Sequence, residues 1–324
     1  MPNSAETVKV VQKGVHLGAE IQGVDLTRSL DAATFKVIED AFVQHELLVF
    51  HDQPISSHQQ IEFAKMFGDL SVHPFSPNSD ETPELIIFDN DADNPPFSTD
   101  VWHSDETFRT NPPMATMLHG LIIPEVGGDT VFASMTSAYE SLSDRMKYFI
   151  SGLECVHDFK PFRALFGADE KSKADLRFFE DRYPPIVHPV IRKHPISGKP
   201  VLYVNPQFSI KIKGMEESES RNLLNQLFDL ARIPELQFRH RWRVDTLVIW
   251  DNRSTQHYAV HDYFPQRRKL DRVTIQGDKV IAYSDAADIK SVQNNKSTFP
   301  DNPKVKHGGH TPKRQLMRDH KEKI

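Results

Sequence analysis

The sequence predicts a mainly β protein, a double-sheet jelly roll with flanking helices. Short apolar runs, separated by Pro-Pro, Gly-Gly and Asp-Asn clusters, occupy residues 84–135, and similar runs return in PVLYVNP, TLVIWDN, HYAV and RVTIQGD. Runs and separators of this kind are typical of strands and turns. A long mixed insertion lies between the two groups, whereas a doubly wound parallel sheet would alternate strand and helix regularly.

An amphipathic helix is expected near the start of the chain, before these strands. Asp31 opens it, and the residues of one face recur at helical spacing: Phe35, Ile38, Phe42 and His45. The apolar run 47–50 then predicts a strand. Two later helices are expected near 137–150 and 216–230, the second with a stripe of leucines.

A second early helix is expected within SSHQQIEFAKMFG. Ser57 and Gln60 have the spacing of a capping box, and Gly68 is placed to end the helix. We expect this helix and the preceding one to brace a sheet.

One domain is expected over residues 1–289, with helical insertions, followed by a flexible basic tail over 290–324. A chain of 324 residues can bury a substantial single core. The tail carries nine Lys or Arg against three Asp or Glu and has little apolar content, so it cannot fold alone. We expect it to be solvated, packed on the surface or on a partner subunit. Contact with nucleic acid or an anionic surface is the alternative.

The composition limits the classes of partner. A formal net charge of -6 argues against general nucleic-acid binding, which needs clustered Lys and Arg. Cys155 is the only cysteine, which excludes an intramolecular disulfide or a thiolate-rich metal site and is expected of a reducing compartment. The opening residues contain no apolar core of signal-peptide length, and no apolar run anywhere in the sequence approaches the length of a membrane span. The sequence therefore predicts a cytoplasmic protein that contacts no membrane and binds a small molecule.

Three residues have the pattern of a metal site. In VWHSDETF, His103 and Asp105 are two positions apart, so an extended backbone would point both side chains the same way. A third ligand is available in WDNRSTQHYAV, where His257 begins an apolar run after a strand end. Two imidazoles and one carboxylate leave three adjacent octahedral positions free, an arrangement that non-haem iron(II) uses for oxygen chemistry. The His-x-Asp pattern alone is common by chance, so it needs support from other residues.

Two arginines supply that support. Arg268 starts a strand after a Pro-containing turn, and positions 268, 270, 272 and 274 share one face by the two-residue period. A guanidinium on an interior face needs an anionic partner. If 2-oxoglutarate chelates the iron, its far carboxylate needs a planar, bidentate donor, and Arg268 fits that need, which leaves Arg272 for a second anion. Surface ion pairs for both arginines are the alternative.

Longer segments extend the pattern. WHSDETF, GGDT, WDNRSTQHYAV and DYFPQRRKLDRVTI resemble the signature segments of the taurine dioxygenase family of 2-oxoglutarate-dependent oxygenases, in family order and with family-like spacing. Similar text runs from about Gly23 to Asp278. The resemblance implies a double-stranded β-helix core that uses iron(II), oxygen and 2-oxoglutarate, the last being decarboxylated to succinate.

Carried over residue by residue, the resemblance assigns a role to eight side chains. It makes three of them the catalytic iron ligands: His103, Asp105 and His257. Thr130 of GGDT and Arg268 hold the distal carboxylate of 2-oxoglutarate. Arg272 and His73 match the positions that bind the sulfonate in the taurine enzyme, and Phe208 matches an aromatic pocket wall. Without the resemblance, His73 would be interpreted as a turn histidine next to Pro74.

Departures from the taurine pattern lie where substrate specificity is expected. Ser76 replaces a tyrosine, the PPFSTDVW loop is one residue longer, and Pro161-Phe162-Arg163 replaces a serine-containing segment. These changes argue against taurine itself as the substrate and indicate a larger or less polar substrate. A sulfonate, an alkyl sulfate ester and an aryloxyalkanoate remain open.

The sequence thus predicts a dioxygenase of sulfur metabolism. We expect it to hydroxylate a small anionic substrate, an organosulfonate or alkyl sulfate, which then fragments to an aldehyde plus sulfite or sulfate. An aryloxyalkanoate dioxygenase is the alternative within the family. A non-catalytic metal- or anion-binding jelly roll is less favoured because the ligand triad is intact, and a zinc hydrolase would not need Arg268. We expect a homo-oligomer, a dimer or tetramer.

Overall fold

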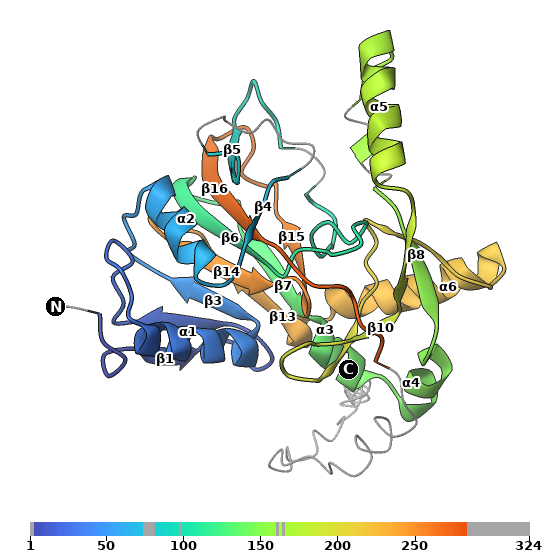
Figure 1. Cartoon of the computed structure of the whole chain (residues 1–324), viewed down its shortest axis with the longest axis horizontal. Coiled ribbons are helices and arrows are strands. Elements are labelled where there is room, and N and C mark those ends of the chain that lie inside the picture. Colours follow the sequence, from blue (N-terminus) through green and yellow to red (C-terminus); the bar gives the residue numbers. More distant parts are fainter. Residues whose placement is uncertain (1–2, 74–81, 97–98, 160–161, 164–165, 284–324) are drawn as a thin grey trace, which may run out of the picture. The chain divides into compact units, whose positions relative to one another are not determined.

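A computed structural model describes residues 3–73, 82–96, 99–159, 162–163 and 166–283 (Figure 1). Within these ranges no helix is both long enough and apolar enough to span a membrane. The expected tail lies outside them, so the domain boundary at residue 289 stays a prediction.

Two sheets with antiparallel strands form the centre of the fold. The larger sheet has eight strands in the order β1-β2-β3-β14-β6-β16-β4, and β5 also pairs with β16. Only β2 and β3 run parallel in it. Its strands are β1 (Lys9–Gln12), β2 (Ala19–Gln22), β3 (Leu47–Phe50), β4 (Leu70–Ser71), β5 (Leu85–Asn90), β6 (Ala115–Ile122), β14 (Leu247–Asp251) and β16 (Arg268–Ile275).

The smaller sheet has the order β13-β7-β15. Its strands are β7 (Thr130–Ser134), β13 (Gln237–His240) and β15 (Thr255–Ala259). The insertion between β7 and β13 adds two short sheets of its own, with strand orders β12-β8-β9 and β10-β11. Their strands are β8 (Glu154–His157), β9 (Ile186–Pro189), β10 (Ile191–Lys193), β11 (Pro200–Leu202) and β12 (Ser209–Ile212).

Side chains of the larger sheet alternate between two cores. On β14, Leu247 and Ile249 pack in a cluster with α1 (Ala32–His45) and α2 (Ser57–Lys65). Val248 and Trp250 point the other way and pack with Phe132 of the smaller sheet. This two-residue period is that of a strand buried on both faces. The inner face, between the two sheets, is the one that the site uses.

The first two helices confirm the expected bracing, with one correction. Asp31 caps α1 and accepts a hydrogen bond from the Thr34 N–H. The predicted capping box of α2 is wrong by one residue, because Ser56 and Gln59 form it. Ser57 instead donates to Asp271 Oδ2 (2.7 Å) and ties the helix to β16.

The helix expected near 137–150 is two helices. Leu142 has an extended backbone, which ends α3 (Met135–Ser141), and the Ser143 side chain caps α4 (Asp144–Ile150) by accepting from the Met146 N–H. A serine with its own backbone partner competes with helix continuation. The helix expected near 216–230 is α6 (Glu217–Phe228), and 3-10 turns follow it over Asp229–Arg232 and Pro234–Leu236.

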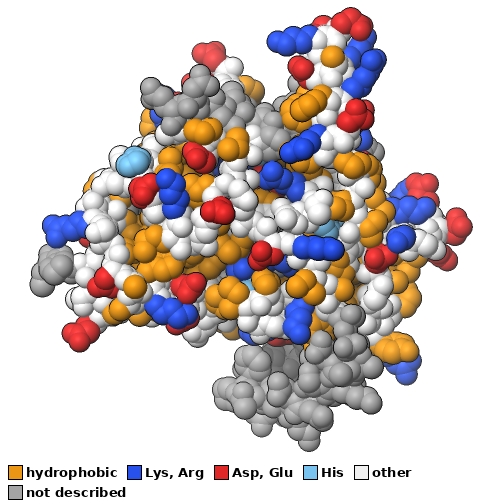
Figure 2. All heavy atoms as spheres, viewed as in Figure 1, with side chains coloured by type: hydrophobic (Ala, Val, Ile, Leu, Met, Phe, Trp, Pro, Cys, Tyr) orange, Lys and Arg blue, Asp and Glu red, His pale blue; other side chains and the backbone are white. Residues whose placement is uncertain are grey.

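Helix α5 (Glu170–Arg182) was not predicted. It begins after the N-cap Asp169, and none of its residues is buried. Figure 2 shows charged side chains of both signs along it. Without a buried stripe its sequence carries little of the apolar periodicity on which the other helices were predicted.

Buried neutral histidines make the fold sensitive to acid. Burial lowers the pKa of His188 to about 4 and, with His51 nearby, that of His240 to about 3. These histidines contribute their full stabilisation of the fold when the pH is above about 6.5, the pKa of histidine in the unfolded chain. Below it the unfolded chain takes up protons that the folded chain does not, so stability falls by about 1.4 kcal/mol per pH unit for each. Burial raises the pKa of Glu46 to about 7, so over this range its contribution to stability increases as the pH falls and cancels that of one histidine.

We therefore expect the free energy of unfolding in urea to fall between pH 6.5 and pH 5. His240→Gln should reduce that slope by about 1 kcal/mol per pH unit. An unchanged slope in the variant would contradict the assignment of His240 as a buried neutral group.

Candidate metal centre

His103 and His257 are held side by side by the smaller sheet. His257 lies in β15, and His103 pairs with it as an antiparallel bridge. The backbone N–H of His103 donates to His257 O (3.0 Å), and that of His257 donates to His103 O (2.8 Å). The two ring centroids are 4.1 Å apart. The bridge explains how residues 154 positions apart present adjacent imidazoles.

Asp105 completes the cluster. One ligand atom from each of His103, Asp105 and His257 lies within 4.8 Å of the others, and all three residues are buried. Asp105 Oδ1 is 3.7 Å from His103 Nε2 and 3.9 Å from His257 Nε2. The extended backbone expected for Asp105 is wrong, because the residue begins a turn in which Glu106 has a positive φ of 47°. The turn still brings the carboxylate to the imidazoles.

The donor set fits a divalent metal ion. His103 Nδ1 is 2.6 Å from Val101 O, and a carbonyl only accepts, so Nδ1 carries the proton and Nε2 presents a lone pair. Burial lowers the pKa of both histidines, so both are neutral ligands. Burial alone would raise the pKa of Asp105, but the surrounding groups, Arg272 first among them, hold that pKa well below its usual range.

Asn252 and Thr116 orient Asp105. Its Oδ2 accepts from Thr116 Oγ1 (2.5 Å) and from Asn252 Nδ2 (3.3 Å), which leaves Oδ1 facing the histidines. Asn252 Oδ1 in turn accepts from the Asp105 N–H (3.2 Å) and from Trp250 Nε1 (2.9 Å). Sequence reasoning missed both residues, although Asn252 lies in the WDN segment.

We expect Asn252→Ala to weaken metal binding by about 10–100-fold, the range for removing a residue that orients a ligand. Titration of metal-free protein with Mn(II) or iron(II) measures the change. Asn94→Ala, on an exposed loop, is the matched control. Unchanged affinity in Asn252→Ala would mean that Thr116 alone orients Asp105.

A pocket of about 80 Å³ joins the cluster to Arg268 and Thr130. The triad, Arg268, Leu270, Arg272 and Thr130 all line it, which confirms that positions 268, 270 and 272 share an interior face. Arg268 lies over the rings of Trp242 (5.6 Å) and Tyr263 (5.5 Å). Gly128 is required here, because a Cβ would lie 3.1 Å from Arg268 Cδ and its φ is +72°.

Arg268 lacks an acidic partner. It makes no ion pair within the described ranges, its Nε has no hydrogen-bond partner, and burial lowers its pKa to about 10. Thr130 Oγ1 accepts from Trp242 Nε1 (2.9 Å), so its own hydroxyl proton can be donated elsewhere. Surface ion pairs for Arg268 and Arg272 are excluded, since both are only 7% exposed. Tyr263 and the more distant Asp129 offset only part of the effect of burial on the pKa of Arg268. A buried cation that no ion pair neutralises fits a carboxylate ligand.

Arg272 and His73 meet at Glu106, which sequence reasoning missed. Arg272 Nη2 is 3.1 Å from Asp105 Oδ2 and 3.8 Å from Glu106 Oε1. His73 Nε2 is 3.8 Å from the same Glu106 oxygen, and burial together with Arg272 lowers the pKa of His73 to about 3. The sequence offers one signal for Glu106, which is that it is an acidic residue directly after the ligand Asp105.

Aromatic side chains lie beside the triad. Phe208 is buried with Phe108 and Phe159, and its ring centroid is 6.5 Å from that of His103. Phe162 packs against Phe208 and lies 6.2 Å from His73. Ser76, Pro161 and part of the PPFSTDVW loop lie outside the described residues.

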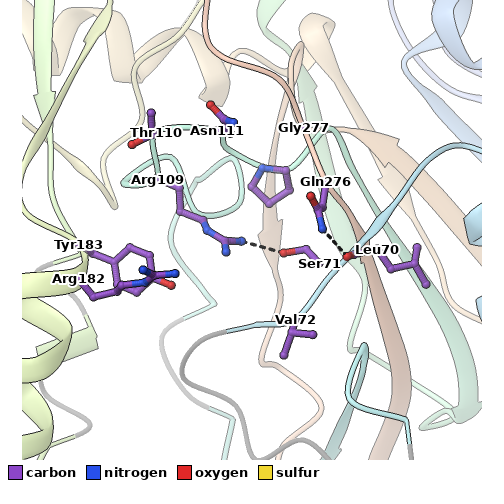
Figure 3. Close-up of a pocket in the computed structure, with 11 residues that line it drawn as sticks. Leu70, Ser71, Val72, Arg109, Thr110, Asn111, Arg182, Tyr183, Gln276 and Gly277 are labelled. Carbon is purple, nitrogen blue, oxygen red and sulfur yellow. Dashed lines mark hydrogen bonds between the residues drawn. The ribbon is translucent and has the colours of Figure 1, made fainter.

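Arg109 lines a separate, polar pocket of about 580 Å³ (Figure 3). None of the triad lines it, and its walls come from β4, the loop of residues 109–113, the two residues that follow β16 and the end of α5. Arg109 Nη1 donates to Ser71 Oγ (2.8 Å) and to Glu106 Oε2 (3.0 Å), so this arginine connects the pocket to Glu106.

Comparisons with known proteins bear on the family and the fold. The model of the taurine catabolism dioxygenase family, TauD and TfdA, matches residues 8–274. An alkylsulfatase of Acinetobacter baylyi is 37% identical over 81% of this chain and 83% of its own. An alpha-ketoglutarate-dependent sulfate ester dioxygenase of Pseudomonas putida is 36% identical over 81% of this chain and 87% of its own. The crystal structure of a taurine dioxygenase from Burkholderia xenovorans superposes with a TM-score of 0.73 at 32% identity, over 88% and 99%. The predicted jelly-roll fold is thereby confirmed.

Proposed function

The chain belongs to the taurine catabolism dioxygenase family, and on that premise we propose that it hydroxylates an organosulfonate or an alkyl sulfate ester. As a member it is an iron(II)- and 2-oxoglutarate-dependent dioxygenase. The observation that carries the proposal is the order of groups along one inner strand face. Arg268, which makes no ion pair within the described residues, and Arg272, which contacts Asp105 of the triad, both line the small pocket and lie four positions apart on β16.

The proposed division of labour follows from that order. His103, Asp105 and His257 would hold the iron, because His103 Nε2 and His257 Nε2 both face Asp105 Oδ1. Arg268 and Thr130 bind the distal carboxylate of 2-oxoglutarate. Arg272 and His73 bind the anionic group of the substrate, and Phe208 packs against its carbon chain.

Bound iron(II) and 2-oxoglutarate supply the oxidising chemistry: with oxygen, the co-substrate becomes succinate and carbon dioxide and a substrate C–H becomes C–OH. The chain's residues position that C–H bond and keep water out. Burial of Phe208, Phe108 and Phe159 makes the substrate side apolar. A carbon that carries both a hydroxyl and a sulfonate or sulfate group loses sulfite or sulfate and leaves an aldehyde.

Oxygen-free protein mixed with iron(II), 2-oxoglutarate and one candidate substrate, then exposed to oxygen, tests the proposal. We expect stoichiometric succinate together with sulfite from alkanesulfonates or sulfate from alkyl sulfates, and little succinate without substrate. Stoichiometric phenol from phenoxyacetate, without turnover of the sulfur compounds, would contradict the proposal in favour of an aryloxyalkanoate substrate.

The two arginines should be separable. Arg272→Ala should raise the KM for the substrate by more than tenfold and that for 2-oxoglutarate by much less, since truncating a buried charge partner costs about 2–5 kcal/mol. Iron affinity has to be measured in parallel, because Arg272 also contacts Asp105. Equal effects on both KM values would mean that the roles of Arg268 and Arg272 are assigned wrongly.

We also propose that the protein acts in the cytoplasm as a homo-oligomer. The single cysteine, Cys155, is free and buried, which supports a reducing compartment. Size-exclusion chromatography with light scattering tests the assembly.

A further inference from the structure

Glu106 is a buried acid that the proposed roles leave unexplained. Its residue is 2% exposed, and it follows the ligand Asp105 directly. Its φ of 47° lies in the left-handed region, which costs a non-glycine residue about 1 kcal/mol or more and which glycine or asparagine adopts more readily.

The two oxygens of Glu106 have different surroundings. Oε2 accepts a hydrogen bond from Arg109 Nη1 (3.0 Å), and the same nitrogen donates to Ser71 Oγ (2.8 Å). Figure 3 shows Arg109 reaching Ser71 across the edge of the larger pocket. Arg109 thus holds the carboxylate from one side and fixes which oxygen points inward.

The inward oxygen, Oε1, is buried and has no hydrogen-bond partner in the described part of the chain. Its two polar neighbours, Arg272 Nη2 and His73 Nε2, are each 3.8 Å away, beyond the roughly 3.2 Å limit of a good hydrogen bond. Arg272 Nη2 also lacks a hydrogen-bond partner by geometry. A buried group without a hydrogen bond costs about 1–3 kcal/mol, and these two meet only as a long ion pair, so one ligand or water between them could bond to both.

The spacing selects the chemistry of that ligand. An atom that contacts both groups must accept from Arg272 and donate to Glu106. A hydroxyl does both, and an oxyanion next to an ammonium does the same with two atoms. A purely anionic head would satisfy Arg272 but would face Glu106 without a proton to donate. Arg272 also already faces the Asp105 carboxylate at 3.1 Å.

We infer that Glu106 is a specificity-determining residue whose Oε1 accepts a hydrogen bond from a hydroxyl or ammonium group of the substrate. The substrate therefore carries such a donor beside its anionic group. This inference rests on the proposed function and narrows it. The departures at Ser76 and Phe162 predicted a less polar pocket, whereas Glu106 supplies a polar contact at a different place.

Matched substrates test the inference on the unmodified protein. Ethanesulfonate is compared with 2-aminoethanesulfonate and 2-hydroxyethanesulfonate, and equivalent sets are run as sulfate esters and carboxylates. Calorimetry without oxygen, with iron(II) and 2-oxoglutarate present, gives each Kd, and succinate release gives kcat/KM. We expect at least one compound with an amino or hydroxyl group to bind at least tenfold more tightly than the corresponding compound without it. Equal or weaker binding of both would overturn the inference and leave a water molecule as the occupant.

Glu106→Gln provides an isosteric variant. Because Arg109 only donates, it should select the amide oxygen and turn the amide NH2 toward the substrate, which exchanges an acceptor for a donor. We expect the donor advantage to disappear, while ethanesulfonate binds as well as before or better. Glu154→Gln, which alters an exposed pair with Lys213, is the matched control and should leave all ratios unchanged. If Glu106→Gln kept the same ratio of affinities for donor-bearing and plain substrates, Glu106 would not be the acceptor.

Failure of the inference and of the proposed function give different results. Turnover confined to carboxylates would contradict the sulfonate or sulfate substrate, while the preference for a donor within that series would still decide the role of Glu106. Plain alkyl sulfonates or sulfates as the best substrates would support the proposed function and overturn the inference. Absence of binding in all three series would contradict both.

Discussion

Replacing His257 with alanine should eliminate metal binding and 2-oxoglutarate turnover. The loss should exceed the roughly 10–100-fold expected for a residue that only orients a ligand, because one of three donor atoms disappears. The fold should survive, since the bridge to His103 uses backbone N–H and C=O groups, which alanine retains. Iron content, the visible charge-transfer band with 2-oxoglutarate, and succinate release measure the effect.

His58→Ala is the matched control, because His58 is exposed and lies in α2, away from the triad. It should bind iron and release succinate as the unmodified protein does. Undiminished succinate release by His257→Ala, with the fold intact, would contradict the ligand assignment.

The period of two along the strands made much of the site predictable. Alternation on β16 brought Arg268 and Arg272 to one face, and β14 shows the same alternation between two cores. Burial acts on every second residue of such a strand, so the pattern is written locally in the sequence. The ligand triad needed longer segments, because its third member is 152 positions after Asp105.

Features that depend on distant partners were not predictable. Ser57 was expected to cap α2, but its hydroxyl donates to Asp271 Oδ2, and local spacing contains no information about β16. The same holds for Asn252, whose amide reaches Asp105 across 147 positions. Glu106 was missed for a related reason: its burial depends on Arg109, Arg272 and His73, and acids are usually exposed.

Arg268→Ala should raise the concentration of 2-oxoglutarate needed for half-maximal binding by about 10²–10³-fold. Its guanidinium is buried and has no acidic partner within the described ranges, so the co-substrate's carboxylate would be its anion. Truncating one member of a buried charge pair costs about 2–5 kcal/mol, or about 30- to 4,000-fold in affinity, and the expected loss lies in the middle of this range. Arg268→Lys should recover part of the affinity, because it keeps the charge and loses the planar pair of donors.

Its neighbour Arg267 offers an unusually close control. Arg267 points to solvent and pairs with Asp89 (2.7 Å), an exposed contact worth little. Arg267→Ala should leave the affinity for 2-oxoglutarate unchanged. Arg268→Ala should leave iron binding in the absence of 2-oxoglutarate unchanged, because no ion pair or hydrogen bond joins Arg268 to the triad within the described residues. Calorimetric titration of 2-oxoglutarate into oxygen-free iron(II) protein separates the two effects. Equal losses in both variants, or loss of iron from Arg268→Ala alone, would show that Arg268 supports the strand rather than the co-substrate.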